Sequence, residues 1–227
     1  MIIFKNVSRI FNRDHTALER ATFEIKDGEF VLLIGRSGAG KTTILKLISR
    51  ADVPTHGQIL YKNLNYDHIR KKDIVQLRRK IVSIFQDFKL LMDQSVFDNV
   101  MMGLEILGKP MREAQKKAEE ALRQVDLYHH GPILARFLSG GEKQRVAIAR
   151  AIAMDAEVIL ADEPTGNLDP ISGKEVMDLM KKINAQGKTI IMATHNKEVV
   201  DMLKTRVITL SNGRIAKDET PGKFTLV

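Results

Sequence analysis

Cysteine is absent from the sequence, which excludes disulfide bonds and zinc sites built from thiolates and suits a reducing cytosol. Long apolar runs are also missing, because stretches such as 30–34 fall far short of the about 20 residues that cross a membrane as a helix. Residues 1–6 lack the basic start and the long apolar stretch of a signal peptide. We therefore expect no membrane-spanning helix, and a chain that stays in the compartment where it is made.

Aromatic residues are scarce, at 5% of the chain, although the formal net charge is +8. The basic runs 70–72 and 78–80 have no interleaved aromatic residues, so we predict no nucleic-acid binding. The excess charge suits an anionic lipid surface, an acidic partner or simply a solvated surface, and the sequence leaves these alternatives open. Proline and glycine punctuate turns without forming a linker, so the 227 residues predict one globular domain.

The spacing of apolar residues predicts an α/β fold. Alternation predicts half-buried strands over 2–7 and 22–25. Continuous apolar runs predict strands buried on both faces at 29–34, 81–85, 158–161, 189–193 and 207–210. The apolar residues of 43–48 have helical spacing and predict a helix there. Between 97 and 128 an amphipathic helix is marked by Ala114, Ala118, Ala121, Leu122 and Val125. A helical insert is therefore expected inside an α/β core.

The first chemical motif has the pattern G-x-x-x-x-G-K-[ST] and lies between a predicted strand and a predicted helix. Its residues are Gly35, Arg36, Ser37, Gly38, Ala39, Gly40, Lys41 and Thr42. Glycines let backbone N–H groups wrap closely around phosphates at the start of a helix. Lys41 would place its charge on the β- and γ-phosphates of ATP, and Thr42 would offer its hydroxyl to Mg²⁺. The alternative is a chance glycine turn, which the strand-to-helix context disfavours.

The second motif is an apolar strand, 158–161, that ends in Asp162 and Glu163. In open α/β sheets, ligands bind at the carboxyl ends of the strands. Asp162 would hold Mg²⁺, usually through water, and Glu163 would polarise the attacking water, which are the positions that phosphoryl transfer requires. Alone, the pattern also fits a strand that ends in solvated acids.

The third motif, Leu138–Glu142, is a Ser-Gly-Gly turn that opens a helix. Such a turn can bind a second anion through its backbone N–H groups and the helix dipole. An ordinary helix start capped by Ser139 is the alternative. Two phosphate sites with only one glycine-lysine loop suggest that the second site serves the nucleotide of a neighbouring molecule.

With the three motifs in this order, the chain resembles the ATP-binding-cassette (ABC) ATPases along its whole length. The resemblance assigns Phe11 to adenine stacking, Gln86 to Mg²⁺ and to sensing a membrane partner, and His195 to the γ-phosphate. It also assigns 167–169 to a loop that crosses the dimer interface. The remaining nucleotide-binding positions that it implies are Thr43, Ser139, Gly140, Gly141, Glu142 and Asp169. The chain departs from the family pattern at Asn196, where many relatives carry aspartate, and at Arg36, which is larger than the usual residue.

The resemblance implies an α/β P-loop NTPase of the ABC-cassette type, with a mostly parallel RecA-like core sheet, an antiparallel β subdomain and a helical subdomain. One domain would span 1–227, with the core at about 1–86 and 155–227 and the helical subdomain at about 87–154. ATP and Mg²⁺ would be the cofactors. The implied catalytic residues are Lys41, Glu163 and His195, and the implied metal-site residues are Thr42, Gln86 and Asp162.

The resemblance also implies partners. Each ATP would lie between the glycine loop of one subunit and the Ser139 turn of another, so that ATP binding closes a homodimer. An integral membrane protein would dock beside Gln86, where the apolar residues Phe88, Leu90, Leu91 and Met92 follow. This would place the chain peripherally on the cytoplasmic side of the bacterial inner membrane.

Segment 162–169 is similar to the branch that holds the lipoprotein-release, macrolide-export and cell-division ATPases. Within that branch, segments 85–93 and 96–100 are most similar to the cell-division ATPases. A lipoprotein-releasing or macrolide-efflux ATPase is the alternative. A P-loop kinase or GTPase is disfavoured by the motif at 138–142. A DNA-repair cassette is disfavoured by the short span before that motif and by the lack of cysteine.

Overall fold

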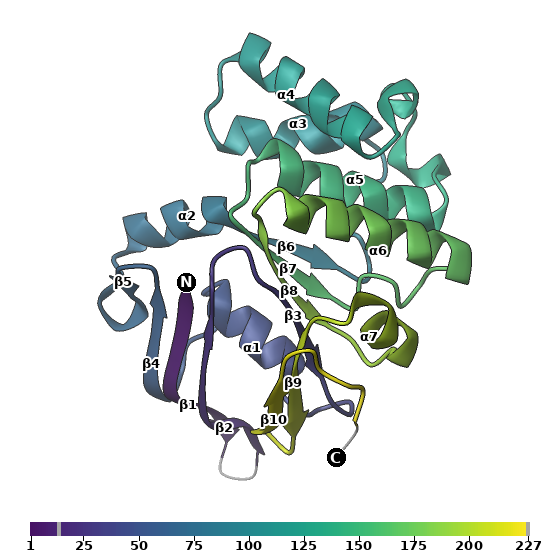
Figure 1. The fold of residues 1–227 in the computed structure, drawn as a ribbon. Helices are drawn as coiled ribbons and strands as arrows, with labels where there is room; N and C mark the ends of the chain where they lie inside the picture. Colours follow the sequence, from purple (N-terminus) through teal and green to yellow (C-terminus); the bar gives the residue numbers. More distant parts are fainter. Residues whose placement is uncertain (13–14, 226–227) are drawn as a thin grey trace.

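The computed structural model describes residues 1–12 and 15–225, in which two sheets and a layer of helices are stacked (Figure 1). The core sheet has the strand order β10-β9-β3-β8-β7-β6. Its strands are β3 (Phe30–Ile34), β6 (Ile81–Phe85), β7 (Val158–Asp162), β8 (Thr189–Ala193), β9 (Arg206–Ser211) and β10 (Arg214–Glu219). All pairs are parallel except β9 with β10 at one edge. The predicted mostly parallel core sheet is confirmed.

The central strands β3 and β8 are buried on both faces, which explains their continuous apolar sequence. Alternate residues of β3 enter two separate cores. Leu32 and Ile34 pack beneath the helical layer, whereas Val31 and Leu33 pack around helix α1 (Lys41–Ile48). The strand that precedes the glycine loop is therefore fixed from both sides.

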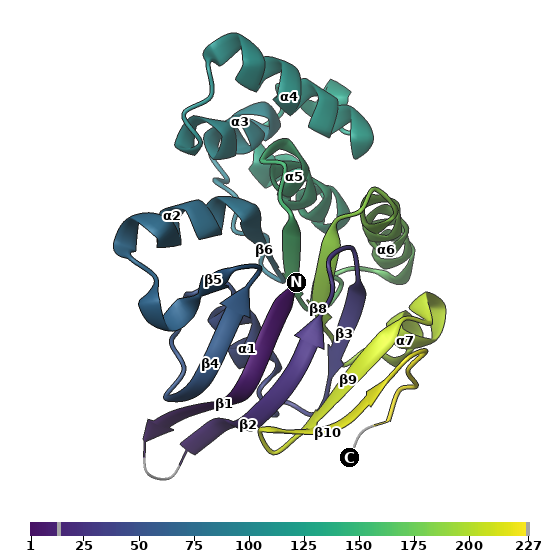
Figure 2. The same ribbon diagram turned by 60° about the vertical axis from the view of Figure 1, so that its left-hand side comes forward.

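The second sheet is antiparallel and has the order β2-β1-β4-β5. Its strands are β1 (Ile2–Asn12), β2 (His15–Ile25), β4 (His56–Tyr61) and β5 (Leu64–Asn65). Helix α1 lies between this sheet and the core sheet (Figure 2) and contributes Ile44, Leu47 and Ile48 to their shared core. The expected antiparallel β subdomain is thus present, and β1 and β2 are longer than the predicted strands.

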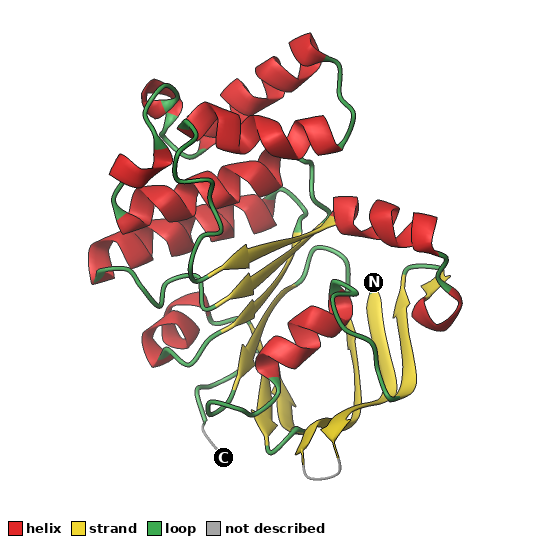
Figure 3. Ribbon diagram, turned by 180° about the vertical axis from the view of Figure 1, so that it is seen from behind, coloured by secondary structure: helices red, strands yellow, loops and turns green. Residues whose placement is uncertain are grey.

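A helical layer covers the opposite face of the core sheet (Figures 1 and 3). Its helices are α3 (Val96–Ile106), α4 (Met111–Gln124), α5 (Gly140–Ala153), α6 (Pro170–Ala185) and α7 (Lys197–Leu203). Among the described residues, short 3₁₀ helices lie at Tyr66–His68, Tyr128–His130 and Ala135–Phe137. Helix α4 buries Ala114, Ala118, Ala121 and Leu122, which are residues of the predicted apolar face.

Several elements were not predicted, namely the helices α2 (Lys71–Lys80), α6 and α7 and the strands β4, β5 and β10. The strand β10 is exposed along almost its whole length, and α2 carries the two basic runs at its ends, so neither shows a clear apolar face. Within the described residues, no helix combines the length and apolar character needed to span a membrane.

Candidate active site

The glycine loop connects β3 to α1, and two of its glycines are required by close backbone contacts. Gly35 has φ 152°, and a Cβ there would lie 2.5 Å from the Leu210 carbonyl oxygen. Gly40 has φ 105°, and a Cβ there would lie 2.5 Å from the Ala17 carbonyl oxygen. Because Gly40 caps α1 without a side chain, the first-turn N–H groups of the helix face the loop. This arrangement suits an anion at the helix N-terminus.

Lys41 is almost fully buried and folds back over the glycine loop. Its Nζ donates hydrogen bonds to the carbonyl oxygens of Gly35, at 2.7 Å, and Arg36, at 3.1 Å. Burial lowers the pKa of Lys41, and the nearby charges of Glu163 and Asp162 oppose that shift. The ammonium group is therefore held above the loop, beside both carboxylates, where it can reach a bound phosphate.

A cavity of about 200 Å³ brings one predicted aromatic residue to the glycine loop. It is lined by Phe11, Ala17, Ser37, Gly38, Ala39, Gly40, Lys41, Thr42, Thr43 and Glu163. Phe11 is half exposed, with the Arg9 guanidinium 4.5 Å from its ring centroid. An aromatic face at one end and a phosphate loop at the other match the two ends of ATP. Arg36 instead lines a separate cavity of about 260 Å³ with Ser211 and Asn212.

Thr42 and Asp162 come together at the carboxyl end of β7, and the Thr42 hydroxyl donates to the Asp162 carboxylate at 3.2 Å. Burial raises the pKa of Asp162, and the neighbouring Glu163 charge adds to this shift. A buried carboxylate beside a second one favours a cation. The hydroxyl and carboxylate oxygens are hard ligands that suit Mg²⁺, whose remaining positions are commonly taken by water and phosphate oxygens. The residues present fit the ion.

Glu163 adopts a left-handed backbone conformation, with φ 49°. Its N–H donates to the Ala193 carbonyl oxygen of β8 at 2.9 Å, and its Oε1 lies 2.8 Å from His195 Nδ1. His195 is largely exposed, in the segment between β8 and α7. Asn196 caps α7 by accepting a hydrogen bond from the Glu198 N–H, as an aspartate would. The departure at Asn196 therefore keeps the helix start intact.

Gln86 follows β6 and is paired with Asn167. The Gln86 amide donates to Asn167 Oδ1 at 2.9 Å, and the Asn167 amide donates to the Gln86 carbonyl oxygen at 3.2 Å. Both residues line a cavity of about 870 Å³, together with Thr42, Asp162 and Glu163. The structure thus brings Gln86 to the predicted metal site, with its side-chain amide turned toward the loop 167–169.

The Leu138–Glu142 motif opens α5 and packs against that same loop. Ser139 caps α5 in a reciprocal arrangement with Glu142. A Cβ on Gly141 would lie 2.8 Å from the Ser172 hydroxyl of α6, so the packing of α5 against α6 also requires glycine here. Asp169 caps α6 by accepting from the N–H groups of Ile171 and Ser172. None of the residues that line the glycine-loop cavity belongs to this motif.

Comparison with known proteins agrees with this arrangement. A family model described as ABC transporter matches residues 18–166. The chain is 45% identical over 224 residues to the cell division ATP-binding protein FtsE of Bacillus subtilis, covering 99% of this chain and 98% of that one. The chain belongs to the ABC transporter family. It is therefore an ABC ATPase, which binds and hydrolyses ATP.

Two further comparisons concern sequence and structure. The methionine import protein MetN 1 of Bacillus cereus is 38% identical over 97% of this chain but over only 65% of its own length. The dimeric post-hydrolysis structure of the cassette MJ0796 with ADP and Pi matches with a TM-score of 0.87, at 35% identity, over 99% of this chain and 100% of that one. The expected ABC-cassette fold is thereby confirmed.

Two polar residues that hold the loop after Gln86 were not predicted from the sequence. Arg150 of α5 donates to the carbonyl oxygens of Phe88, at 3.0 Å, and Lys89, at 2.9 Å, and both of those residues are left-handed. Asn99 of α3 is fully buried and exchanges two hydrogen bonds with the Leu91 backbone. Residues 88–92, the Gln86-side loop, are therefore attached to the helical layer. Neither residue carries a local motif, so no sequence signal was available.

Proposed function

We propose that this ATPase works as one of a head-to-tail pair of identical subunits and drives an integral membrane protein of the FtsX kind in bacterial cell division. Motion driven by ATP would pass through that partner to cell-wall hydrolases outside the membrane. The full-length match to FtsE supports this choice, because the chain covers 98% of that relative but only 65% of the methionine importer.

The observation that carries the two-subunit proposal is the separation of two anion-binding turns. The glycine-loop cavity is lined by Phe11, loop residues and Glu163, without Ser139 or its neighbours. The Ser139 turn packs against the loop 167–169 instead. A second copy would bring its Ser139 turn over the first copy's phosphates, and the similar cassette MJ0796 is dimeric with ADP and Pi.

Within one site the residues divide the chemistry. Bound Mg²⁺ would neutralise phosphate charge during phosphoryl transfer, held by Thr42 and Asp162 with Gln86 close by. Lys41 would leave the Gly35 carbonyl oxygen for the β- and γ-phosphates. Glu163 would orient the attacking water, and His195 would hold the Glu163 carboxylate in place, in keeping with their 2.8 Å contact.

The proposed dock for the membrane protein is the Gln86-side loop. Leu91 and Met92 are 47% and 38% exposed, although Leu90 beside them is buried. The exposed pair begins two residues after Lys89, whose carbonyl oxygen accepts a hydrogen bond from Arg150. This location would keep the chain peripheral, on the cytoplasmic side of the bacterial inner membrane. A lipoprotein-releasing or macrolide-efflux ATPase would use the same dock with a different partner.

A mixing experiment tests the shared site. Lys41→Ala and Ser139→Arg chains should each be inactive alone, because every site in a homodimer would contain the defect. Mixed in equal amounts, they form heterodimers with one intact site, so about a quarter of the wild-type ATPase rate should return. Mixtures without recovery, although both variants still dimerise, would refute a site shared between subunits.

Co-expression tests the partner. The chain should co-purify with a four-span membrane protein that carries one large extracytoplasmic loop, and Leu91→Asp with Met92→Asp should abolish this while sparing basal ATPase activity. Ile106→Asp, at another exposed apolar position, is the matched control. Co-purification with a many-span permease instead would favour the transporter alternative.

A further inference from the structure

The first turn of α5 contains a carboxylate, Glu142, that is hydrogen-bonded to the Ser139 hydroxyl. Glu142 Oε2 accepts hydrogen bonds from the Ser139 N–H and from the Ser139 hydroxyl, each at 2.8 Å. In return the Glu142 N–H donates to the Ser139 hydroxyl oxygen at 3.3 Å. The carboxylate therefore holds both the backbone and the side chain of the Ser139 turn.

A serine hydroxyl has one proton to donate, and this one is donated to Glu142. Phosphate oxygens are acceptors, so a phosphate from a second copy's ATP needs the same proton. Hydrogen bonds to an ionised acceptor are roughly twice as strong as neutral ones, so the competition is substantial. Ser139 must turn away from Glu142 before it can donate to the nucleotide.

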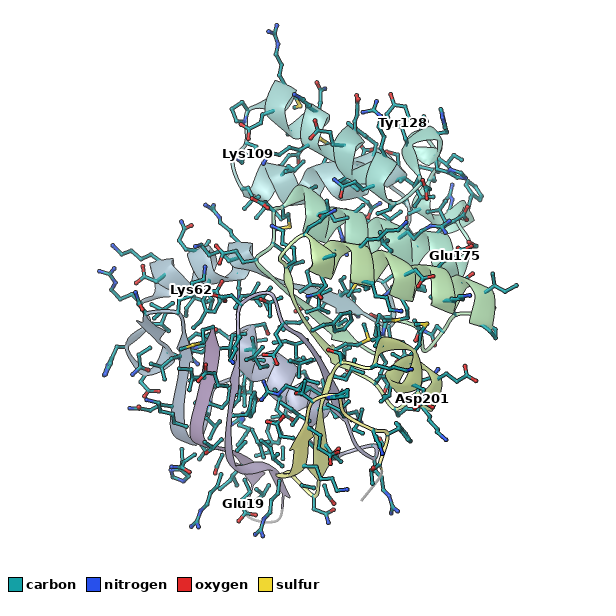
Figure 4. The ribbon with its side chains drawn as sticks, in the orientation of Figure 1. Glu19, Lys62, Lys109, Tyr128, Glu175 and Asp201 are labelled. Atoms are coloured by element: carbon teal, nitrogen blue, oxygen red, sulfur yellow. The ribbon has the colours of Figure 1, made fainter. Side chains whose placement is uncertain are left out.

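The surroundings keep Glu142 ionised. The backbone N–H and hydroxyl of Ser139 lower the pKa of Glu142, with smaller contributions from the charges of His130 and Arg145. The helix dipole favours a negative charge in the first turn. Arg145 is already paired with Glu175 of α6 at 2.7 Å, and Glu175 is labelled in Figure 4. The Ser139 hydroxyl that would donate to a phosphate is thus already bonded to an internal carboxylate.

His130 contacts the other oxygen of this carboxylate, with its Nε2 3.4 Å from Glu142 Oε1. It ends the 3₁₀ helix that begins at Tyr128, which lies at the same end of the helical layer as Glu175 (Figure 4). A positively polarised group this close to Oε1 draws negative charge toward that oxygen and weakens the hold of Oε2 on Ser139. His130 is therefore placed to adjust the strength of the competition.

We propose that Glu142 competes with ATP for the Ser139 hydroxyl, and that His130 positions the Glu142 carboxylate and weakens this competition. The proposal rests on the proposed role of Ser139 in the ATP site of a second copy. It gives Glu142 a role opposite to nucleotide binding: the residue opposes closure of the pair until the nucleotide displaces it.

The test uses the full chain with Glu163→Gln as background, so that ATP is held without rapid hydrolysis. Sedimentation velocity measures the ATP concentration at which half of the chain is dimeric. Glu142→Gln removes the charge but keeps an oxygen that accepts from the Ser139 N–H, since glutamine also forms this capping arrangement. Glu120→Gln, on the exposed face of α4, is the matched control for the loss of one negative charge.

Glu142→Gln should lower the half-dimer ATP concentration by about three- to tenfold at about 0.1 M salt, because the Ser139 hydroxyl then no longer donates to an ionised acceptor within the chain. The gain should shrink at about 1 M salt, where charges are screened within about 3 Å. Glu120→Gln should change nothing. His130→Ala should raise the half-dimer ATP concentration, His130→Gln should restore it in part, and His130→Ala should have no effect when combined with Glu142→Gln.

An unchanged or higher ATP requirement in Glu142→Gln, with thermal unfolding like that of the parent chain, would overturn the proposal. An effect of His130→Ala that persists in the Glu142→Gln chain would also overturn it, because His130 would then act elsewhere. Ser139→Ala separates this result from the proposed function. If Ser139→Ala leaves the half-dimer ATP concentration unchanged, the Ser139 hydroxyl does not bind the nucleotide and the competition proposal fails, whereas the shared site is tested separately by the mixing of Lys41→Ala and Ser139→Arg chains. If Ser139→Ala raises that concentration, only the competition by Glu142 is at issue.

Discussion

The proposed catalytic carboxylate is held in a conformation that L-residues disfavour, so its removal should separate activity from stability. Glu163 has φ 49°, and the left-handed region costs an L-residue about 1–2 kcal/mol. Glycine in place of Glu163 removes this cost but gains about 0.5–1 kcal/mol of unfolded-state entropy. It also removes the Glu163 charge, and that charge is one cause of the raised pKa of Asp162. The contact with the largely exposed His195 contributes at most about 1 kcal/mol.

These contributions predict that Glu163→Gly leaves the free energy of unfolding unchanged or raises it by about 1 kcal/mol, in urea titrations followed by circular dichroism. The same chain should lose ATP hydrolysis by about 10²–10⁴-fold in kcat. Glu163→Gln, which keeps the side-chain shape, should lose kcat to the same extent, with stability within about 0.5 kcal/mol of wild type.

Lys204 provides the matched control, because it has φ 48° at the exposed C-terminal cap of α7. Lys204→Gly should raise the free energy of unfolding by about 0.5–1 kcal/mol with no change in kcat. If Glu163→Gly instead destabilised the chain by more than about 1 kcal/mol while Lys204→Gly stabilised it, the Glu163 side chain would be a structural anchor. The inference of a strained catalytic position would then be wrong.

Three further predictions concern binding and stability. Lys41→Ala should weaken ATP binding by at least about 100-fold in isothermal titration, because a charge pair at about 4 Å is worth about 4 kcal/mol at an effective dielectric of about 20. Asn99→Ala should lower the free energy of unfolding by about 2–4 kcal/mol in urea titrations, because buried backbone groups lose their partners. Although burial raises the pKa of Glu157, hydrogen bonds from Lys62 and Tyr61 outweigh it and hold that pKa at about 2, against 4.5. The stability from Glu157 is therefore present above about pH 4.5 and lost as the pH falls toward about 2, and Glu157→Gln should flatten that part of a pH titration of thermal unfolding.

The parts of the fold that the sequence predicted are those whose signals are local. A run of buried apolar residues ending at Gly35 predicts a central strand, and the Ser-Gly-Gly turn at 139–141 predicts a helix start. The helix α2 and the strand β10 were missed because their exposed residues show no periodic apolar face. Tertiary contacts define these elements, as with the edge strand β10, which pairs with β9.

The candidate site divides in the same way. Lys41, Thr42, Asp162 and Glu163 follow from motifs that each occupy one strand end, and the structure brings them together. The pairing of Gln86 with Asn167 joins residues 81 positions apart, and no local pattern predicts it. Hydrogen bonds between side chains that are far apart in the sequence depend on the folded geometry alone.

The hydrogen bonds around Gln86 leave a short connection between the core sheet and the attachment of the Gln86-side loop to the helical layer. The strand β6 ends at Phe85 in the core, whereas Phe88 and Lys89 are bonded to Arg150 of α5. Only Gln86 and the residue after it lie between these two attachments. A force on the exposed part of the Gln86-side loop would therefore be transmitted directly to α5, whose first turn carries the Ser139 hydroxyl. The hydrogen bond between Gln86 and Asn167, at 2.9 Å, would oppose movement of α5 relative to the core sheet. Substituting Asn167 should therefore ease movement of α5 relative to the core sheet, while the bonds from Arg150 to Phe88 and Lys89 stay in place.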